Sequence, residues 1–413
     1  MSHVTSLSCI LCGREHAPSQ VLYTCPSCGP DGVLDVLYDY SALSGKVFPG
    51  KDVFSLWRYK DILPVEAERE VPPLRVGWTP LYAPQRLRAT LGLSALFLKD
   101  DTVNPTASFK DRASAVGVAV AMALGKEPIT CASTGNAASS LAGICASQGI
   151  ETIIFVPETA PRAKVVQLLM FGARVFTVKG TYDDAFDLSM EATRLFGWYN
   201  RNTSYNPYLL EGKKTVSLEI WEQLGEKVPD RIYVPVGDGC IIGGVWKGFE
   251  DLRRMGRTDR MPALVGVQAE GSSAVTRAWE TGVLPEKTDC STFADSISVG
   301  IPRAWRQAVR AVKETGGEMI TVSDKEIAQA MGILARESGI FSEPAGATAF
   351  AGILKSHRAG TLDSASSVVA LVTGAGLKDI DGAARACTSQ AVSLEPHVEA
   401  LKEAVREGSL RHS

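Results

Sequence analysis

The chain has 413 residues, of which 45% are hydrophobic and 22% are charged, as in an ordinary globular protein with a large buried core. Its formal net charge of −3 and its lack of charge runs argue against a basic nucleic-acid-binding surface. No apolar run is long enough to span a bilayer, and residues 1–4 lack the charged start of a signal peptide. We therefore expect a cytoplasmic protein without nucleic-acid or membrane partners.

Residues 1–40 form a short polar module with two CxxC pairs. The cysteines of these pairs are Cys9, Cys12, Cys25 and Cys28. Gly13 and Gly29 follow the pairs, and glycine suits a tight knuckle that turns two thiolates toward one ion. The spacing predicts a zinc ribbon whose Zn2+ is structural, because a closed four-thiolate site leaves no position for a substrate. Metal-free surface thiols and a redox pair are the alternatives.

After a connecting segment at 41–75, apolar runs alternate with helical patterns from residue 79 onward. Buried strands are expected at 95–98, 129–132, 152–156, 174–178, 232–236, 264–267 and 368–372. Helices are expected at 111–125, 137–149, 162–172, 182–196, 214–224, 243–255, 324–339 and 345–355. This alternation predicts an α/β architecture with mostly parallel sheets. Residues 394–413 are expected to form a final helix and a frayed tail.

The stretch 104–112 reads NPTASFKDR and places Lys110 in a turn of small and polar residues before a helix. A lysine in such a position can form a Schiff base with an aldehyde cofactor. The amine must first lose its proton, and Arg112 and the start of the helix are the nearby groups that favour this loss. An exposed lysine beside Asp111 is the alternative interpretation of the same residues.

The stretch 133–140 reads STGNAASS, follows the strand expected at 129–132 and opens a helix. Free N–H groups at a helix N-terminus bind anions, so this turn suits a substrate carboxylate. Asn136 is also placed to form a hydrogen bond with a ring hydroxyl of the cofactor. A helix N-cap without any ligand is the alternative.

The stretch 236–244 reads VGDGCIIGG and leads from a strand through a glycine-rich loop into a helix, a geometry that cradles phosphate with backbone amides. It does not have the dinucleotide-binding GxGxxG pattern. Thr373 ends the strand at 368–372, where its hydroxyl would reach a ring nitrogen, although a glycine turn alone explains the same letters. Glu343 opens another helix, either as a cap or as a cofactor neighbour. The five histidines lie outside all of these loops, which argues against a Ser-His-Asp hydrolase or a histidine metal centre.

Taken in order, these motifs resemble fold type II (the β-family) of pyridoxal 5'-phosphate (PLP) enzymes, and within it the threonine synthase family. The resemblance covers about 79–379 and rests on NPTASFKDR, STGNAASS, the PVG-initiated loop, NPYLLEGKKT, EPAGA and TGAGLKD. It implies a tryptophan synthase β-like fold with two three-layer α/β domains beside the ribbon. The large PLP-binding domain would comprise 41–102 and 206–393, and the small domain 103–205.

The resemblance also implies roles for individual residues. Lys110 would be the catalytic residue that holds PLP. The other cofactor-binding residues would be Phe109, Asn136, Gly237, Asp238, Gly239, Cys240, Ile241 and Thr373. The substrate carboxylate would be held by Ser133, Thr134, Asn136 and Ala137. The implied reaction converts O-phospho-L-homoserine and water to L-threonine and phosphate, in a homodimer. A threonine dehydratase, a cysteate-synthase-like enzyme acting on O-phosphoserine, or a non-catalytic relative are the alternatives.

The sequence also departs from the family pattern. Many threonine synthases carry an arginine that grips the substrate phosphate where this chain has Leu209, and a leucine cannot pair with a dianion. Ala107 stands in place of the usual glycine, GDGCI replaces a GNAGN-like loop, and 294–299 lacks an arginine seen in many synthases. The basic residues considered as replacements for the missing arginine are Lys213, Lys214, Arg162 and Arg303.

Overall fold

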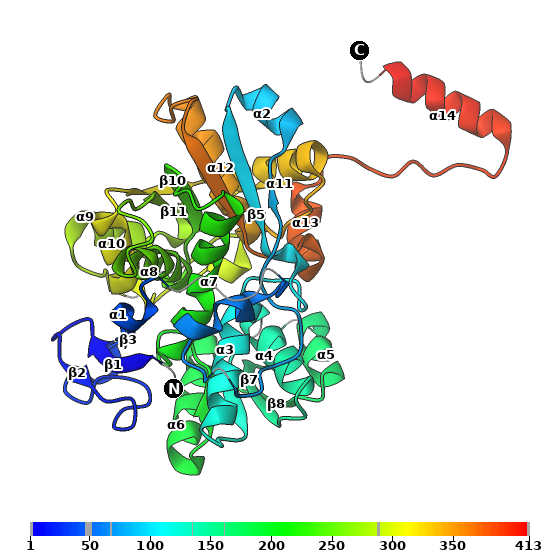
Figure 1. Ribbon diagram of the computed structural model, residues 1–413. Helices are drawn as coiled ribbons and strands as arrows, with labels where there is room; N and C mark the ends of the chain where they lie inside the picture. The colour runs from blue at the N-terminus through cyan, green and yellow to red at the C-terminus, as the bar shows by residue number, and fades with distance from the viewer. Residues whose placement is uncertain are drawn as a thin grey trace.

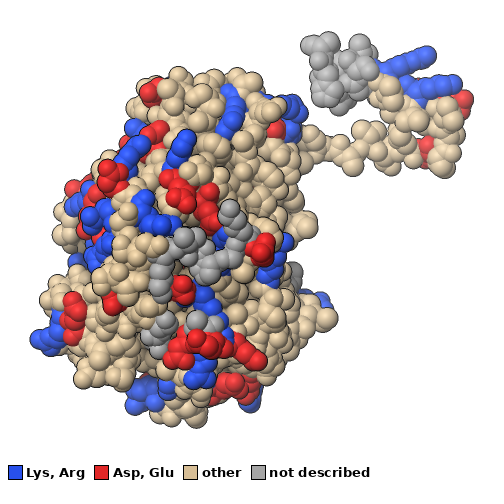
Figure 2. Space-filling model, viewed as in Figure 1, with Lys and Arg blue, Asp and Glu red and all other residues tan. Residues whose placement is uncertain are grey.

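The computed structural model describes residues 3–45, 52–66, 68–133, 135–160, 162–286 and 290–410. Its described strands form three separate sheets, of three, six and four strands. Figure 1 shows the N-terminal three-stranded sheet as a small lobe beside a larger α/β body. On the face drawn in Figure 2, the described acidic and basic side chains are interspersed. No described helix is both long and apolar enough to cross a membrane.

The three-stranded sheet is the cysteine-bearing module. Its strands are β1 (Val4–Cys9), β2 (Glu15–His16) and β3 (Leu34–Tyr38), all antiparallel in the order β2-β1-β3. Gly13 and Gly29 have φ angles of 69° and 63°, and their N–H groups donate to the carbonyls of Cys9 and Cys25 at 2.9 Å. The glycine knuckles predicted from the sequence are therefore confirmed.

A buried polar network joins this module to the large body. The partners in the body are α7 (Tyr208–Gln223) and α8 (Cys240–Arg254). The hydroxyl of Tyr38, at the end of β3, donates to Glu211 at 2.6 Å, and that of Tyr40, in α1 (Tyr40–Leu43), donates to Asp251 at 2.6 Å. Lys214 bridges the same two acids, with its Nζ 2.7 Å from Asp251. These hydrogen bonds, which are buried or partly buried, fix the ribbon to the two helices.

The six-stranded sheet is parallel except for one edge strand. In sheet order its strands are β12 (Glu318–Val322), β11 (Ala263–Ala269), β10 (Arg231–Pro235), β13 (Ser367–Val372), β5 (Ala95–Asp100) and β4 (Leu81–Tyr82). Only β4 runs antiparallel to its neighbour β5. Successive residues of β10 face two different cores, since Ile232 and Val234 pack with α7 and α8 whereas Tyr233 packs with the opposite helix layer. That alternation defines a three-layer arrangement.

Two sets of helices cover this sheet. One face is covered by α7 and α8 together with α9 (Ala274–Thr281) and α10 (Trp305–Glu314). The other face carries α2 (Gln85–Leu91), α11 (Asp324–Ser338), α12 (Pro344–Arg358) and α13 (Ile380–Ala386). A 3-10 helix at Leu56–Ile62 lies in the connecting segment. The last helix, α14 (Val398–Leu410), stands away from the body at the end of an extended segment (Figure 1).

The four-stranded sheet is entirely parallel. Its order is β8 (Arg174–Val178), β7 (Thr152–Pro157), β6 (Ile129–Ala132) and β9 (Tyr199–Asn200). One face is covered by α3 (Lys110–Ala123), α4 (Asn136–Ala146) and α5 (Arg162–Met170), and the other by α6 (Tyr182–Phe196). The predicted α/β architecture with mostly parallel sheets is confirmed.

Several elements were not predicted at all, among them β12, α9 and α10. Two predicted helices also begin earlier than expected. The helix expected at 214–224 begins at Tyr208, because Pro207 already has helical φ and ψ angles and the added turns bury Leu209 and Leu210. The helix expected at 243–255 begins at Cys240, directly after Gly239. The extra turns bring both helix N-termini closer to the loops that the sequence singled out.

A fully buried ion network holds the start of α3. Arg112 donates to Asp101 at 2.6 Å and to Glu219 at 2.9 Å, and Lys99 lies 2.7 Å from Glu219. Burial alone would raise the pKa of Glu219, but the charges of Arg112 and Lys99 outweigh it and hold that pKa at about 2. Arg112 is therefore committed to this network, and the expectation that it assists the Lys110 amine is wrong.

Replacing Glu219 should reveal how much this network contributes. We expect Glu219→Gln to lower the free energy of unfolding near neutral pH by about 3–5 kcal/mol, because it leaves buried cations with too little counter-charge. The pKa of Glu219 is lower in the folded protein, so the ionised carboxylate stabilises the fold above its ordinary pKa and loses that effect as the pH falls toward about 2. The difference between the variant and the parent should shrink accordingly in acid, as measured by denaturant unfolding.

Glu191→Gln is the matched control, because Glu191 forms an exposed ion pair with Arg194 within α6. It should change the free energy of unfolding by less than about 0.5 kcal/mol. A Glu219 variant that behaves like this control would contradict the assignment.

Candidate active site

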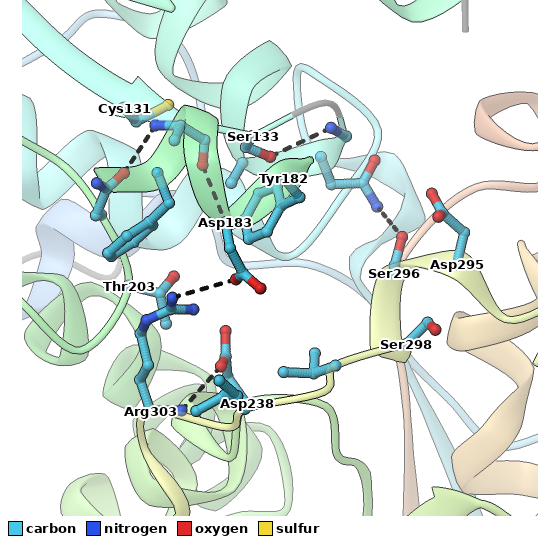
Figure 3. A pocket seen from close by; sticks show the side chains of 18 of the residues that line it. Cys131, Ser133, Tyr182, Asp183, Thr203, Asp238, Asp295, Ser296, Ser298 and Arg303 are labelled. Carbon is cyan, nitrogen blue, oxygen red and sulfur yellow. Dashed lines mark hydrogen bonds and ion pairs between the residues drawn. The ribbon is translucent and has the colours of Figure 1, made fainter. Parts of the chain in front are cut away.

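Loops from the carboxyl ends of the parallel strands meet around one cavity of about 440 Å³, within the usual size range of small-molecule sites. Figure 3 shows part of its wall, with side chains from both large sheets directed toward a common space. The lining residues are Lys110, Cys131, Ala132, Ser133, Gly135, Asn136, Ala137, Pro157, Tyr182, Asp183, Phe186, Arg201, Asn202, Thr203, Asp238, Cys290, Asp295, Ser296, Ser298, Val299, Gly300, Ile301 and Arg303.

Lys110 is the first residue of α3 and lies on the cavity wall. The turn that precedes it is joined to the turn after β13. Phe109 N donates to the carbonyl of Thr373 at 2.8 Å, and Ala375 N donates to the carbonyl of Ala107 at 3.0 Å. Ala107 has a φ of 63°, a left-handed conformation that costs a residue with a Cβ about 1–2 kcal/mol. This strained residue lies in the turn that directs Lys110 toward the cavity.

Asp111 does not cap an exposed lysine. Its side chain is fully buried, and it accepts hydrogen bonds from the backbone N–H of Thr106 at 2.7 Å and from the Thr106 hydroxyl. Burial raises the pKa of Asp111, and the bonds from Thr106 oppose that effect. The alternative interpretation of the 104–112 motif as an exposed lysine beside Asp111 is therefore wrong, because Asp111 braces the turn from inside and Lys110 faces the cavity.

The second loop follows β6 and opens α4. Ser133, Gly135, Asn136 and Ala137 all line the cavity, while Thr134 lies outside the described residues. Within the described residues, the N-cap position Gly135 supplies no side-chain cap to α4, so the first turn keeps N–H groups for an anion. This observation does not support the alternative of a side-chain N-cap. The hydroxyl of Ser133 accepts a hydrogen bond from Gly135 N at 3.2 Å (Figure 3).

Asn136 is held by an acidic neighbour that the sequence left ambiguous. Its Nδ2 donates to Glu343 at 2.8 Å and to Ser296 at 3.3 Å. Glu343 stands at the N-cap position of α12, but its side chain makes no capping hydrogen bond. Burial raises the pKa of Glu343, and the bond from Asn136 partly opposes that rise. Glu343 is thus a site neighbour of Asn136 and not a helix cap.

The glycine-rich loop follows β10 and opens α8. Gly239 has a φ of 97°, and a Cβ built on it would lie 2.8 Å from the carbonyl oxygen of Ala304. Only glycine fits there. Asp238 accepts a hydrogen bond from Arg303 N at 3.1 Å, and its carbonyl accepts one from Ala304 N at 3.0 Å. No side chain caps α8, so the N–H groups of the loop and of the first turn, including those of Cys240 and Ile241, are available to a phosphate.

The basic residues considered as replacements for an arginine at 209 lie in different places and have different partners. Leu209 is buried and packs toward Gly117 of α3, away from the cavity lining. Arg303 does line the cavity, where it lies 3.7 Å from Asp183. Lys214 is occupied by its buried acids, and Arg162 is exposed at the start of α5. Lys213 is buried next to Cys240.

Arg201 lines the cavity but was missed by sequence reasoning. It follows β9, a strand of two residues that is too short to give a periodic signal. The neighbour that brings it to the site is β6, to which β9 is paired in parallel. Because β6 and β9 are far apart in the chain, no pattern of neighbouring residues predicts that they pair.

The four cysteines of the ribbon also converge. The Sγ atoms of Cys9, Cys12, Cys25 and Cys28 all lie within 4.8 Å of one another. Among the described residues there is no disulfide. A set of four thiols at these separations fits a tetrahedral Zn2+ site.

Comparisons with known proteins decide the family. A family model described as "Pyridoxal-phosphate dependent enzyme" matches residues 73–374. The threonine synthase of Methanocaldococcus jannaschii is 39% identical over 406 residues, which cover 97% of this chain and 99% of that protein. The threonine synthase of Methanosarcina acetivorans is 40% identical over 404 residues, covering 97% and 98%. That of Mycobacterium tuberculosis is 36% identical over 326 residues, covering 79% and 88%.

This chain belongs to the threonine synthase family of PLP-dependent enzymes. Solved structures agree with the predicted fold type II. Threonine deaminase isoform 2 from Solanum lycopersicum superposes with a TM-score of 0.63 at 23% identity, covering 75% of this chain and 86% of that one. Maize serine racemase gives a TM-score of 0.64 at 21% identity, covering 81% and 93%. At these identities the structures show the fold alone.

The residues present fit the cofactor of a PLP-dependent family. The cavity has room for a pyridine ring with a phosphate, and it holds a lysine amine between two helix N-termini that no side chain caps. Thr373 and Phe109 lie together at the base of Lys110, since Phe109 N binds the carbonyl of Thr373. A carboxylate, a phosphate and an aldehyde would each find a matching group here.

Proposed function

We propose that the protein is a threonine synthase that converts O-phospho-L-homoserine and water to L-threonine and phosphate. The observation that carries the proposal is the placement of Lys110 in one cavity with Asn136, at the start of α4, and Asp238, in the glycine-rich loop before α8. The curated relatives, named threonine synthases at 36–40% identity, support the same reaction.

PLP would supply the electron-accepting ring that makes the substrate Cα and Cβ protons acidic. In the proposed roles, Lys110 bonds to the cofactor aldehyde and then moves protons at Cα and Cβ of the substrate. Asn136 bonds the ring hydroxyl, Thr373 contacts the ring nitrogen, and Phe109 lies beside the ring. The backbone N–H groups of Gly237, Asp238, Gly239, Cys240 and Ile241 hold the cofactor phosphate. The substrate carboxylate is held by Ser133, Thr134, Asn136 and Ala137.

Position supports this division of work. The 133–137 turn and the 237–241 loop come from different sheets, so a ligand that touches both lies across the cavity with Lys110 in its wall. Such a ligand carries one anionic group toward each helix N-terminus. A substrate joined to the cofactor would have its carboxylate at α4 and the cofactor phosphate at α8, which matches the roles assigned above.

The domain division, the oligomeric state and the compartment also remain proposals. The three described sheets fall within 1–40, within 41–102 joined to 206–393, and within 103–205, and α14 falls within 394–413.

We propose a homodimer, with support from the exposed apolar side chains Val398, Leu401 and Val405 on α14. Light scattering that gives the mass of one chain would refute the homodimer. We also propose a cytoplasmic location, with support from the lack of any disulfide among the described cysteines, and cell fractionation tests it.

Removing the amine tests the proposed reaction. We expect Lys110→Ala to abolish release of phosphate and formation of threonine from O-phospho-L-homoserine, a loss of at least about 10³-fold, since it removes both the cofactor bond and the proton carrier. Lys126→Ala, a lysine outside the cavity lining, is the control and should retain full turnover. The measurement is a coupled phosphate assay with chromatographic detection of threonine.

The same assay separates this reaction from others on the same fold. O-phosphoserine and L-threonine should give neither rapid phosphate release nor 2-oxo acid. Brisk turnover of either compound, with none of O-phospho-L-homoserine, would assign the protein to a β-elimination or β-replacement activity instead.

The ribbon is proposed to hold one structural Zn2+ per chain. Metal analysis of freshly purified protein should find about one zinc per chain, and Cys12→Ser should lose it, because three thiolates bind zinc less tightly than four. Zinc loss should also lower Tm, since the ribbon residues Tyr38 and Tyr40 are bonded to α7 and α8. Cys387→Ser, at an exposed cysteine outside the ribbon, is the control. Protein purified without metal and with unchanged Tm would contradict this proposal.

A further inference from the structure

Arg201 is a buried guanidinium that forms no ion pair with a described acid. It is 1% exposed and lines the cavity. Its Nε donates to the hydroxyl of Ser114 at 3.2 Å, and its Nη2 has no hydrogen-bond partner among the described residues. Burial lowers the pKa of Arg201. The other fully buried arginine of this region, Arg112, lies between two carboxylates that raise its pKa despite its burial.

The contrast between the paired Arg112 and the unpaired Arg201 indicates that Arg201 binds an anionic ligand. Burying a cation without a counter-charge carries a large desolvation penalty, and proteins avoid it unless a ligand supplies the charge. No described carboxylate forms an ion pair with Arg201, although the cavity wall contains Asp183 and Asp238. Both of these acids are engaged with Arg303. The charge of Asp111 also acts on Arg201, but Asp111 accepts hydrogen bonds from Thr106 and forms no ion pair with the guanidinium. A molecule in the cavity is therefore the remaining source of an anion paired directly with Arg201.

A second buried cation stands behind the first. Lys213, in α7, is also 1% exposed, and its Cβ lies against Gly244 of α8, where any larger residue would collide with it. Burial lowers the pKa of Lys213, the nearby Cys240 opposes this, and the charges of Arg201 and Lys110 lower it further. Lys213 does not line the cavity itself, but its charge and that of Arg201 act on each other. Two neighbouring cations suit a dianion better than a single carboxylate.

The strand order places Arg201 at the same edge of the sheet as the carboxylate turn. Ser133 follows β6 and Arg201 follows β9, and these two strands are parallel neighbours. Neighbouring strands lie about 4.8 Å apart. An extended O-phospho-L-homoserine spans about 6 Å from its carboxyl carbon to its phosphorus, given five bonds of ordinary length. The register pairs Asn200 with Thr130, so Arg201 lies beside Cys131, two residues before Ser133, and all three residues line the same cavity. A substrate whose carboxylate is held at the turn that begins with Ser133 can therefore extend its phosphate toward Arg201.

We propose that Arg201, supported by Lys213, forms the subsite for the substrate phosphate dianion and determines specificity for a phosphorylated amino acid. This proposal rests on the proposed function. The other candidates are less suited, because Leu209 is apolar and packs against α3, and Arg303 already has Asp183 at 3.7 Å and stacks on Phe186 at 3.9 Å. The cofactor phosphate has its own donors in the backbone of 237–241.

The test uses the full-length holoenzyme in three forms: the parent, Arg201→Gln and Arg201→Lys. Arg194→Gln is the charge-matched control, because Arg194 is exposed on α6 and paired with Glu191. Four quantities are measured: KM for O-phospho-L-homoserine, the Kd of inorganic phosphate by calorimetry, the Kd of L-threonine by the change in cofactor absorbance, and the Kd of PLP for the stripped protein. Thermal melting establishes that each variant is folded.

Arg201→Gln should raise KM for the substrate and Kd for inorganic phosphate by about tenfold to hundredfold, the value of a buried charge-assisted hydrogen-bond pair. The Kd values of L-threonine and PLP should stay within about twofold of the parent, since neither ligand would use this subsite. Arg201→Lys should recover part of the phosphate affinity, because it keeps the charge but not the fork of donors. Arg194→Gln should match the parent throughout.

Three results would overturn the proposal. Weaker PLP binding with unchanged phosphate binding would assign Arg201 to the cofactor phosphate, and weaker L-threonine binding alone would assign it to the substrate carboxylate. Unchanged values in a folded Arg201→Gln variant would remove it from the site. If the parent enzyme does not turn over O-phospho-L-homoserine, the proposed function fails, while phosphate binding to the holoenzyme still decides whether Arg201 is an anion site.

Discussion

The placement of Lys110 depends on the buried charges around Arg112. Arg112, Asp101, Glu219 and Lys99 carry no net charge together and are almost wholly inaccessible to solvent. They tie the end of β5 and the middle of α7 to the first turn of α3, which begins at Lys110. An ion network of this kind tolerates few alternative geometries, since breaking any pair leaves a charge stranded. The amine is therefore presented by one of the most constrained parts of the molecule.

A second set of constraints directs that amine into the cavity. The backbone hydrogen bonds between 107–109 and 373–375 join the Lys110 turn to the end of β13, and the left-handed Ala107 accepts strain to make the connection. The result is a site built between two sheets, with each anion-binding turn at the carboxyl end of a parallel strand. Buried cations with acids nearby, such as Arg112 and Lys214, stabilise the fold. Arg201 forms no ion pair with a described acid and is the one that we assign to a ligand.

Much of this arrangement could be predicted from sequence, because its signals are local. The apolar runs of β5, β7 and β13, the helix at 182–196 and the CxxC knuckles each follow from a few consecutive residues. The early start of α7 was missed because buried polar residues such as Glu211 hide its apolar face. Arg201 was missed because its position depends on the pairing of β9 with β6, and Glu343 stayed ambiguous because a cap and a site acid look the same in sequence.

The account depends above all on which amine holds the cofactor. Reduction of the holoenzyme with borohydride, followed by digestion and mass spectrometry, would fix the cofactor to its lysine and identify the peptide. The account predicts the added mass on the peptide that contains Lys110, in the turn joined to Thr373. The same mass on Lys213 or Lys378, or on no peptide at all, would contradict it.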